Sequence, residues 1–236
     1  MRERPLDQAS ESSSSSGTAS ERTKQEPLTV IVGGDTRKPY VALACVHSIN
    51  RLRKGGSTAV LDTETLRRAG IYTREKEVRG KQAFDVIDGR PFSTDFSFSR
   101  FLVPVVFGPR HGWVVFCDDD FLWRESIDGI RPLLEDKYAV MVVKHDFAPL
   151  PGMKMDGQIQ LPYRRKNWSS MVAWNTEHPS NRHLTAEVVN TAPGQYLHGF
   201  DWLKDDEIGS LPERWNWLDG HSDPEIDPAA VHYTRG

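Results

Sequence analysis

After residue 27, apolar positions alternate between strand-like runs and helix-like spacings. Residues 28–32 (LTVIV) form a continuous apolar run that ends in a Gly-Gly-Asp turn, as a buried parallel strand does when a loop follows its carboxyl end. Across residues 40–52 the apolar side chains recur at helical spacing, and two glycines then stop the helix. Similar patterns predict strands at 59–62, 84–87, 112–116 and 138–144, a short helix at 63–69, and a core-facing helix with one cation at 96–107.

This alternation of strands and helices predicts an α/β fold with an open, mostly parallel sheet flanked by helices. In such sheets, ligands bind in the crevice beyond the carboxyl ends of the strands. Beyond about residue 150 the periodicity weakens, and the chain becomes rich in Trp, Pro, Gly, His and Asp. We therefore look for function at the strand ends and in this less regular C-terminal half.

The first 27 residues have a different composition. They contain seven serines and few apolar residues, with four basic and five acidic side chains. A segment of this kind buries too little apolar surface to offset its ordering entropy. The prediction is a disordered Ser-rich tail at 1–27 and one folded domain at 28–236.

Overall charge and the two cysteines exclude several classes of protein. The formal net charge is -3, which argues against a basic nucleic-acid binder. No apolar stretch approaches the roughly 18 residues of a membrane span, and no apolar leader follows the N-terminus, so we expect a soluble cytoplasmic protein. Cys45 and Cys117 each lie in an apolar run, which favours small buried thiols over a disulfide or a metal site.

Three consecutive carboxylates, Asp118, Asp119 and Asp120, follow the apolar run at 112–116 directly. Like charges held this close raise one another's pKa, so a positive partner is expected. A divalent cation with oxygen ligands and nucleotide phosphates meets that need. The alternative is an acidic loop that caps a helix at 121–130, because Asp is favoured at helix N-caps.

Two further features bear on phosphate binding. A glycine turn after the first strand, Gly33-Gly34-Asp35, has backbone N–H groups that can cradle phosphate, although such turns are also ordinary loop chemistry. Arg100 stands in an otherwise apolar segment and requires either an internal carboxylate or a bound diphosphate.

A late histidine, His232, completes the candidates. A neutral imidazole can join carboxylates around a borderline metal such as Mn²⁺, whereas a packed or surface histidine is the alternative.

Taken in order, these pieces resemble the retaining glycosyltransferases of the GT-A superfold, close to family 8. The similarity covers most of residues 28–236. It is carried by V-I-V-G-G-D at 30–35, S-F-S-R-F-L-V-P at 97–104, D-D-D at 118–120, L-P-E-R-W-N at 211–216 and H-Y-T-R-G at 232–236.

The resemblance implies specific roles for these residues. Asp118, Asp120 and His232 would hold Mn²⁺ or Mg²⁺ against the diphosphate of a nucleotide-sugar donor, in the first place a UDP-sugar, and an unidentified hydroxyl would accept the sugar. Donor contacts are implied for Gly33, Gly34, Asp35, Arg100, Asp119, Ser169 and Ser170.

The chain departs from the family pattern in three places. Residues 167–170 read N-W-S-S where the family has an Asn-Ser-Gly type segment, and the family's Asp-Gln pair beside the reacting sugar has no single counterpart. Asp201, Asp205 and Asp206 are all candidates for that catalytic position. The sequence also stops at Gly236, where the family continues with a phosphate-binding end.

Two other functions compete with this interpretation. Residues 33–39 (GGDTRKP) are similar to the G-G-x-G-T-R-x-x-P signature of sugar-phosphate nucleotidyltransferases, although the third glycine is absent. A catalytically silent nucleotide- or sugar-binding module is the remaining alternative.

Overall fold

The computed structural model describes residues 27–146, 152–153, 159–160 and 164–234. The predicted tail at 1–27 lies outside these residues except for Pro27, and so does the end at 235–236. Among the described residues, no helix combines the length and apolarity needed to cross a membrane. The cytoplasmic location stays a prediction.

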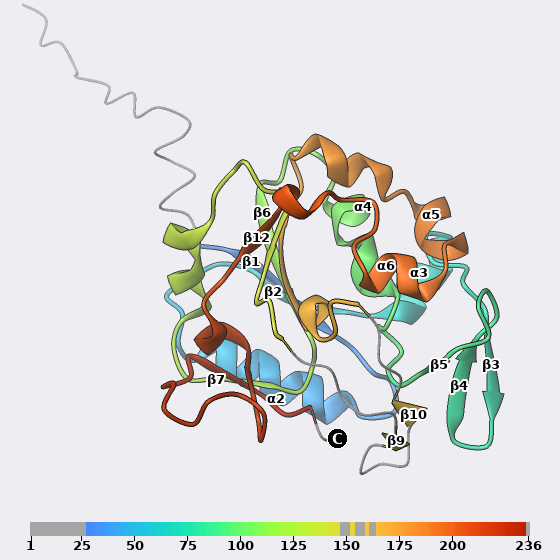
Figure 1. Ribbon diagram of the computed structural model, residues 1–236, viewed down its shortest axis with the longest axis horizontal. Coiled ribbons are helices and arrows are strands. Elements are labelled where there is room, and N and C mark those ends of the chain that lie inside the picture. Colours follow the sequence, from blue (N-terminus) through green and yellow to red (C-terminus); the bar gives the residue numbers. More distant parts are fainter. Residues whose placement is uncertain (1–26, 147–151, 154–158, 161–163, 235–236) are drawn as a thin grey trace, which may run out of the picture.

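A mixed six-stranded sheet forms the centre (Figure 1). Its strand order is β12-β8-β11-β6-β1-β2. Its strands are β1 (Thr29–Gly33), β2 (Thr58–Leu61), β6 (Trp113–Cys117), β8 (Val140–Val142), β11 (Met171–Asn175) and β12 (Ile208–Ser210). The neighbours of β1 are both parallel to it, β8 and β12 are parallel to each other, and β11 is antiparallel to both of its neighbours. The predicted α/β class with an open, mostly parallel sheet is confirmed.

Helices cover the sheet, and three small sheets lie at its margins (Figure 1). The helices are α2 (Pro39–Asn50), α3 (Thr63–Arg68), α4 (Val103–Phe107), α5 (Ala186–Thr191) and α6 (Gly194–His198). The small sheets consist of β3 (Lys76–Arg79), β4 (Gln82–Asp85) and β5 (Pro91–Phe92); β7 (Phe121–Trp123), β13 (Trp217–Leu218) and β14 (Ala230–His232); and β9 (Gly152–Met153) with β10 (Ile159–Gln160). The 3₁₀ helices are Ser99–Leu102, Ile127–Leu133, Trp168–Ser170, Pro179–His183, Asp205–Glu207 and Glu213–Asn216.

The central strands are apolar on both faces because each face has its own core. In β1, Val30 and Val32 join a cluster with α2 and β7, whereas Ile31 points to the opposite cluster, which contains Phe101 and Trp174. Side chains of a strand alternate between the two faces, so a strand covered on both sides needs a continuous apolar run. This is the physical reason for the uninterrupted run at 28–32.

Several predicted elements are shifted or replaced. The strand expected at 84–87 is β4, and it belongs to an antiparallel three-stranded sheet outside the centre. The helix considered for 121–130 is wrong: β7 pairs with β14 there, and the 3₁₀ helix Ile127–Leu133 follows. The segment at 96–107 is helical only from Ser99, first as a 3₁₀ helix and then as α4.

Strand direction brings the candidate residues to one edge of the sheet. Val32 of β1 is in register with Cys117 of β6, so these parallel strands end side by side. Met171, the first residue of antiparallel β11, also pairs with Cys117. The amino end of β11 therefore lies where β1 and β6 have their carboxyl ends.

The two cysteines lie just inside this edge as free, buried thiols. Their Sγ atoms are 4.0 Å apart. Burial is the main cause that raises the pKa of Cys117 well above its ordinary value, so its thiol stays protonated. This agrees with the expected packing role.

Candidate metal and nucleotide-sugar site

The acidic turn after β6 is anchored to the turn before β11. The backbone N–H of Asp118 donates to the carbonyl oxygen of Ser170 at 2.8 Å, which extends the β6–β11 pairing by one step beyond the strands. The three carboxylates thus leave the sheet at its carboxyl edge, from an apolar and largely buried strand.

His232 reaches this turn through the small sheet of β7 and β14. Antiparallel pairing sets His232 opposite Phe121, and the N–H of Tyr233 donates to the carbonyl of Asp120 at 3.0 Å. The His232 residue is 3% exposed, and its imidazole stacks on the Phe121 ring, with centroids 4.4 Å apart. Its Nε2 atom lies 3.2 Å from Oδ1 of Asp120.

Asp118, Asp120 and His232 form a candidate cation site. Each offers one ligand atom, and these atoms lie within 4.8 Å of one another. Two carboxylate oxygens and one imidazole nitrogen suit a hard or borderline divalent ion such as Mg²⁺ or Mn²⁺. The residues present therefore fit the expected metal.

Asp119 lies between these two carboxylates and is 8% exposed. Burial is the main cause that raises its pKa to about 8, and the charges of Asp120, Asp118 and Asp35 add to it. Burial and the neighbouring carboxylates thus disfavour a further negative charge in this turn, in the direction that the sequence indicated.

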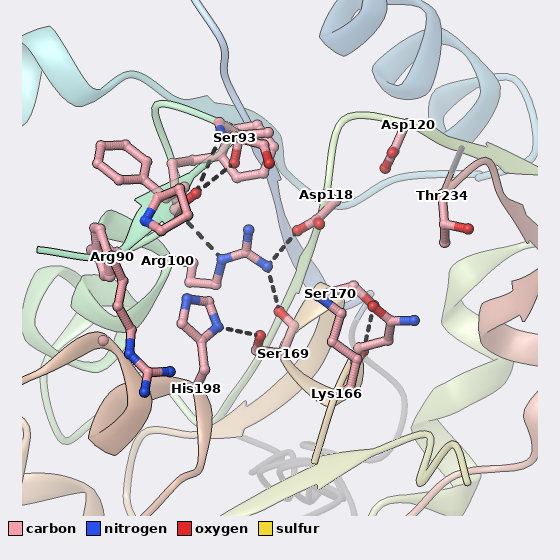
Figure 2. Close-up of a pocket in the computed structure, with 18 of the residues that line it drawn as sticks. Arg90, Ser93, Arg100, Asp118, Asp120, Lys166, Ser169, Ser170, His198 and Thr234 are labelled. Atoms are coloured by element: carbon pink, nitrogen blue, oxygen red, sulfur yellow. Dashed lines mark hydrogen bonds and ion pairs between the residues drawn. The ribbon is translucent and has the colours of Figure 1, made fainter. Parts of the chain in front are cut away.

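Arg100 lies beside the acidic turn (Figure 2). Its Nη1 is 2.6 Å from Oδ1 of Asp118 and donates to the carbonyl of Ser169 at 2.8 Å. Of the two partners considered for this arginine, the structure contains the internal carboxylate. Arg100 also lines the cavity, where it can act on a bound anion.

A cavity of about 190 Å³ opens at this edge of the sheet. Of the predicted site residues, it is lined by Arg100, Asp118, Asp119, Asp120, Ser169, Ser170 and His232. Several other polar residues line the cavity without having been predicted as site residues: Asp88, Arg90, Lys166, Asn167, Gln195 and His198.

His198 is a half-buried neighbour of the predicted donor residue Ser169. Its Nδ1 atom lies 2.8 Å from the Ser169 hydroxyl. Burial, followed by the charge of Arg100, lowers the pKa of His198 well below 6.5, so the ring is neutral. No local pattern marked it, since it occupies the last turn of a short helix, α6.

Asp88 comes from the turn between β4 and β5 and, among the residues that the structure describes, is the one lining carboxylate outside the acidic turn. Its Oδ2 atom accepts a hydrogen bond from the N–H of Gly194, at the start of α6, at 2.8 Å. It was missed because that turn lies outside every motif.

The glycine turn after β1 lies at the same sheet edge but is not part of the cavity lining. A Cβ on Gly33 would come within 2.7 Å of the Phe96 ring, and one on Gly34 within 2.7 Å of Val60. Close packing therefore requires both glycines. Asp35 is buried and accepts hydrogen bonds from the N–H and Nε of Arg37, each at 2.9 Å.

The three candidates for a sugar-facing acid lie elsewhere. Asp201, Asp205 and Asp206 are exposed and do not line the cavity. Asp201 and Asp205 form ion pairs with Arg164, and Asp205 also pairs with Arg165. Asp206 belongs to the same 3₁₀ helix as Asp205.

No protein-family model matches the chain. Over 221 residues, however, it is 43% identical to Protein CDI of Arabidopsis thaliana, an alignment that covers 91% of this chain and 80% of that protein. The chain belongs to the family of Protein CDI. That name states no activity, so the evidence for function in this CDI-family chain comes from the geometry of its site.

Solved structures show which fold this CDI-family chain shares. It resembles the bifunctional glycosyltransferase WbbM with a TM-score of 0.57 and 16% identity, over 89% of this chain and 46% of that one. It resembles GlyE of Streptococcus pneumoniae TIGR4 with a TM-score of 0.53 and 14% identity, over 87% of this chain and 55% of that one. It also resembles mouse xyloside xylosyltransferase 1 with a TM-score of 0.52 and 10% identity, over 88% of this chain and 97% of that one. The chain spans about half the length of the first two. At these identities the likeness establishes the fold, which is of the GT-A type.

Proposed function

We propose that this protein is a metal-dependent, retaining glycosyltransferase, similar to family 8, that moves a sugar from a nucleotide-diphosphate-sugar to a hydroxyl acceptor. A UDP-sugar is the first donor to test. One observation carries the proposal: two carboxylates after β6 and a histidine from β14 meet at a cavity at the carboxyl edge of a GT-A sheet. Packing alone gives no reason for these three to converge on an open cavity.

The donor's diphosphate fits at the acidic end of the cavity. Asp118, Asp120 and His232 would hold a divalent cation, and when bound there it supplies Lewis-acid stabilisation of charge on the leaving diphosphate. Arg100 contributes a fixed positive charge from the cavity wall. Its ion pair with Asp118 also holds that carboxylate in place.

Other residues would shape the rest of the donor site. We propose that the turn at Ser169 and Ser170 faces the donor sugar, since both side chains line the cavity beside Arg100. Gly33, Gly34 and Asp35 stay candidate nucleotide contacts at the neighbouring strand end, and Asp119 stays a candidate donor contact within the acidic turn.

Retention requires the acceptor hydroxyl to attack the anomeric carbon on the face that the diphosphate leaves. Asp201, Asp205 and Asp206 stay candidates for the acid beside the reacting sugar. Asp88 joins them because its carboxylate already lines the cavity outside the acidic turn.

Donor hydrolysis tests the proposal directly. The purified protein would be incubated with a panel of nucleotide-sugars and Mn²⁺, and nucleoside diphosphate release measured with and without EDTA. Release from one donor that EDTA stops is the expected result. Asp227 is exposed and pairs with Arg124 away from the cavity. The variant Asp227→Ala therefore serves as a control for the loss of an acid outside the site, and it should keep the wild-type release.

The same assay separates the rival functions. A nucleotidyltransferase would release pyrophosphate from a nucleoside triphosphate and a sugar phosphate, and a binding module would release nothing. The transferase is supported by the position of Arg37 from the nucleotidyltransferase-like signature, which pairs with Asp35 and is not among the residues that line the cavity.

A further inference from the structure

The metal-site histidine is held from behind by a buried amide. Nδ1 of His232 lies 2.9 Å from Oδ1 of Asn216, a side chain with no exposed surface. The amide nitrogen of Asn216 donates to the hydroxyl oxygen of Ser170 at 2.9 Å, and that hydroxyl lies 2.6 Å from the carbonyl of Asn167. These contacts form one continuous chain from His232 to the backbone of Asn167.

The Asn167 carbonyl determines the direction of every hydrogen bond in this chain. A carbonyl oxygen only accepts, so Ser170 must donate its single hydroxyl proton to it. The Ser170 oxygen is then left to accept, which requires the NH₂ group of Asn216 to face it. The amide oxygen of Asn216 therefore faces His232, and Nδ1 must carry a proton.

This arrangement leaves Nε2 as the ligand atom of His232. Nε2 is the nitrogen that faces Asp120, at 3.2 Å. Stacking on Phe121 restricts rotation of the ring about the same position. A hydrogen bond from the distal nitrogen of a metal-binding histidine generally sets its tautomer and orientation.

The turn at residues 167–170 also supports a second ligand. The carbonyl of Ser170 accepts from the N–H of Asp118 at 2.8 Å, while its hydroxyl accepts from Asn216. One turn thus fixes groups that come from β6 and β14, which are far apart in sequence. A metal site assembled from distant segments needs such a shared support to be formed before the ion arrives.

We propose that Asn216 is a positioning residue: together with Ser170 it holds His232 as the Nδ1–H tautomer, with Nε2 directed to the metal position. The role of His232 as a metal ligand rests on the proposed function. The first prediction, the tautomer, concerns the metal-free protein and stands independently of that function.

The tautomer can be read by ¹⁵N NMR of histidine-labelled, metal-free protein at alkaline pH. We expect Nδ1 of His232 to carry a proton in the wild type, whether or not Nε2 also shares one with the Asp120 carboxylate 3.2 Å away. Asn216→Leu removes the acceptor that faces Nδ1, and Ser170→Ala leaves the Asn216 amide free to turn over. Each variant should therefore shift the proton toward Nε2. A wild-type Nδ1 without a proton, or an Nδ1 that keeps its proton equally in both variants, would overturn the proposal.

Mn²⁺ binding, followed by EPR of the free ion, gives the second readout. Asn216→Leu should weaken affinity by roughly 10- to 100-fold, as loss of an outer hydrogen-bond partner does at other metal sites. Asn216→Asp, which keeps an acceptor for Nδ1–H, should stay within a few-fold of the wild type.

Asn175 provides the control for general destabilisation. It is similarly buried and its amide donates to two backbone carbonyls away from the cavity, so Asn175→Leu should lower stability and leave Mn²⁺ affinity unchanged. Equal affinity of wild type and Asn216→Leu would overturn the positioning role alone. Absence of Mn²⁺ binding by the wild type would instead overturn the proposed metal site, and the tautomer result would still decide the role of Asn216.

Discussion

Nη1 of Arg100 lies 2.6 Å from Oδ1 of Asp118, and the two side chains are only 6% and 16% exposed. The pair joins the segment before α4 to the strand end that carries the acidic turn. Removing one partner of such a pair leaves a charge without compensation in a place with little water.

This pair predicts a strong coupling in unfolding experiments. Arg100→Leu should lower the free energy of unfolding by about 3 kcal/mol. Adding Asp118→Asn should restore part of that loss, since the isolated carboxylate is then gone. Urea titrations of the four proteins in this double-mutant cycle measure the coupling. If the two losses in the free energy of unfolding are additive, Arg100 and Asp118 do not stabilise the protein through their interaction.

Asp120→Ala should abolish donor hydrolysis and Mn²⁺-dependent nucleoside diphosphate binding without unfolding the protein. Asp120 is about one-third exposed and stands beside two other acids, so its removal relieves repulsion in the metal-free state. A melting temperature equal to or above that of the wild type is the expected companion result. Wild-type turnover by this variant, or in EDTA, would contradict the metal role.

His232→Ala removes a metal ligand and a packed ring together. We expect Mn²⁺-dependent nucleotide binding to fall much more than metal-free binding, and stability to decrease because the stack on Phe121 is lost. Phe121→Leu is the matched control, since it disrupts the same stack but keeps the imidazole. Equal losses of binding with and without metal in His232→Ala would favour a packing role.

His145 predicts a pH dependence of stability. Burial, with a smaller contribution from His232, lowers its pKa from 6.5 to about 4. Its Nε2 atom is buried and has no hydrogen-bond partner among the described residues. Between these two pKa values the unfolded chain binds a proton that the folded protein does not, so stability falls as the pH decreases from 6.5 toward 4.

Replacing this ring tests the effect. His145→Phe should raise the free energy of unfolding more at about pH 5 than at about pH 8, with a ceiling on the order of 3 kcal/mol for a shift of this size. Denaturant titrations at both pH values measure the difference. A gain that is the same at both would show that His145 does not titrate in this way.

Deleting residues 1–26 should leave the melting temperature and donor hydrolysis unchanged. The segment is rich in serine and offers few apolar side chains to a core. Pro27 is kept because it lies against the glycine turn at Gly56. A melting temperature several degrees lower would show that the segment docks on the domain.

The sequence by itself determined features that depend on one element at a time. The continuous apolar runs of β1 and β6 predicted strands buried on both faces, because alternate residues of each meet different cores. The acidic triplet directly follows an apolar strand. Its three carboxylates therefore lie at a strand end in any fold of this class. The importance of His232, in contrast, came from the resemblance to a family.

Tertiary structure alone decided the partners of those residues. Met171–Asn175 is a short apolar run that the sequence analysis did not select, and nothing in a run of that kind gives its direction. As antiparallel β11, it brings Ser170 to Asp118 and, through Asn216, to His232. Local periodicity records which side of an element is buried, but the groups that meet there depend on contacts between distant segments, and those form only when the chain packs.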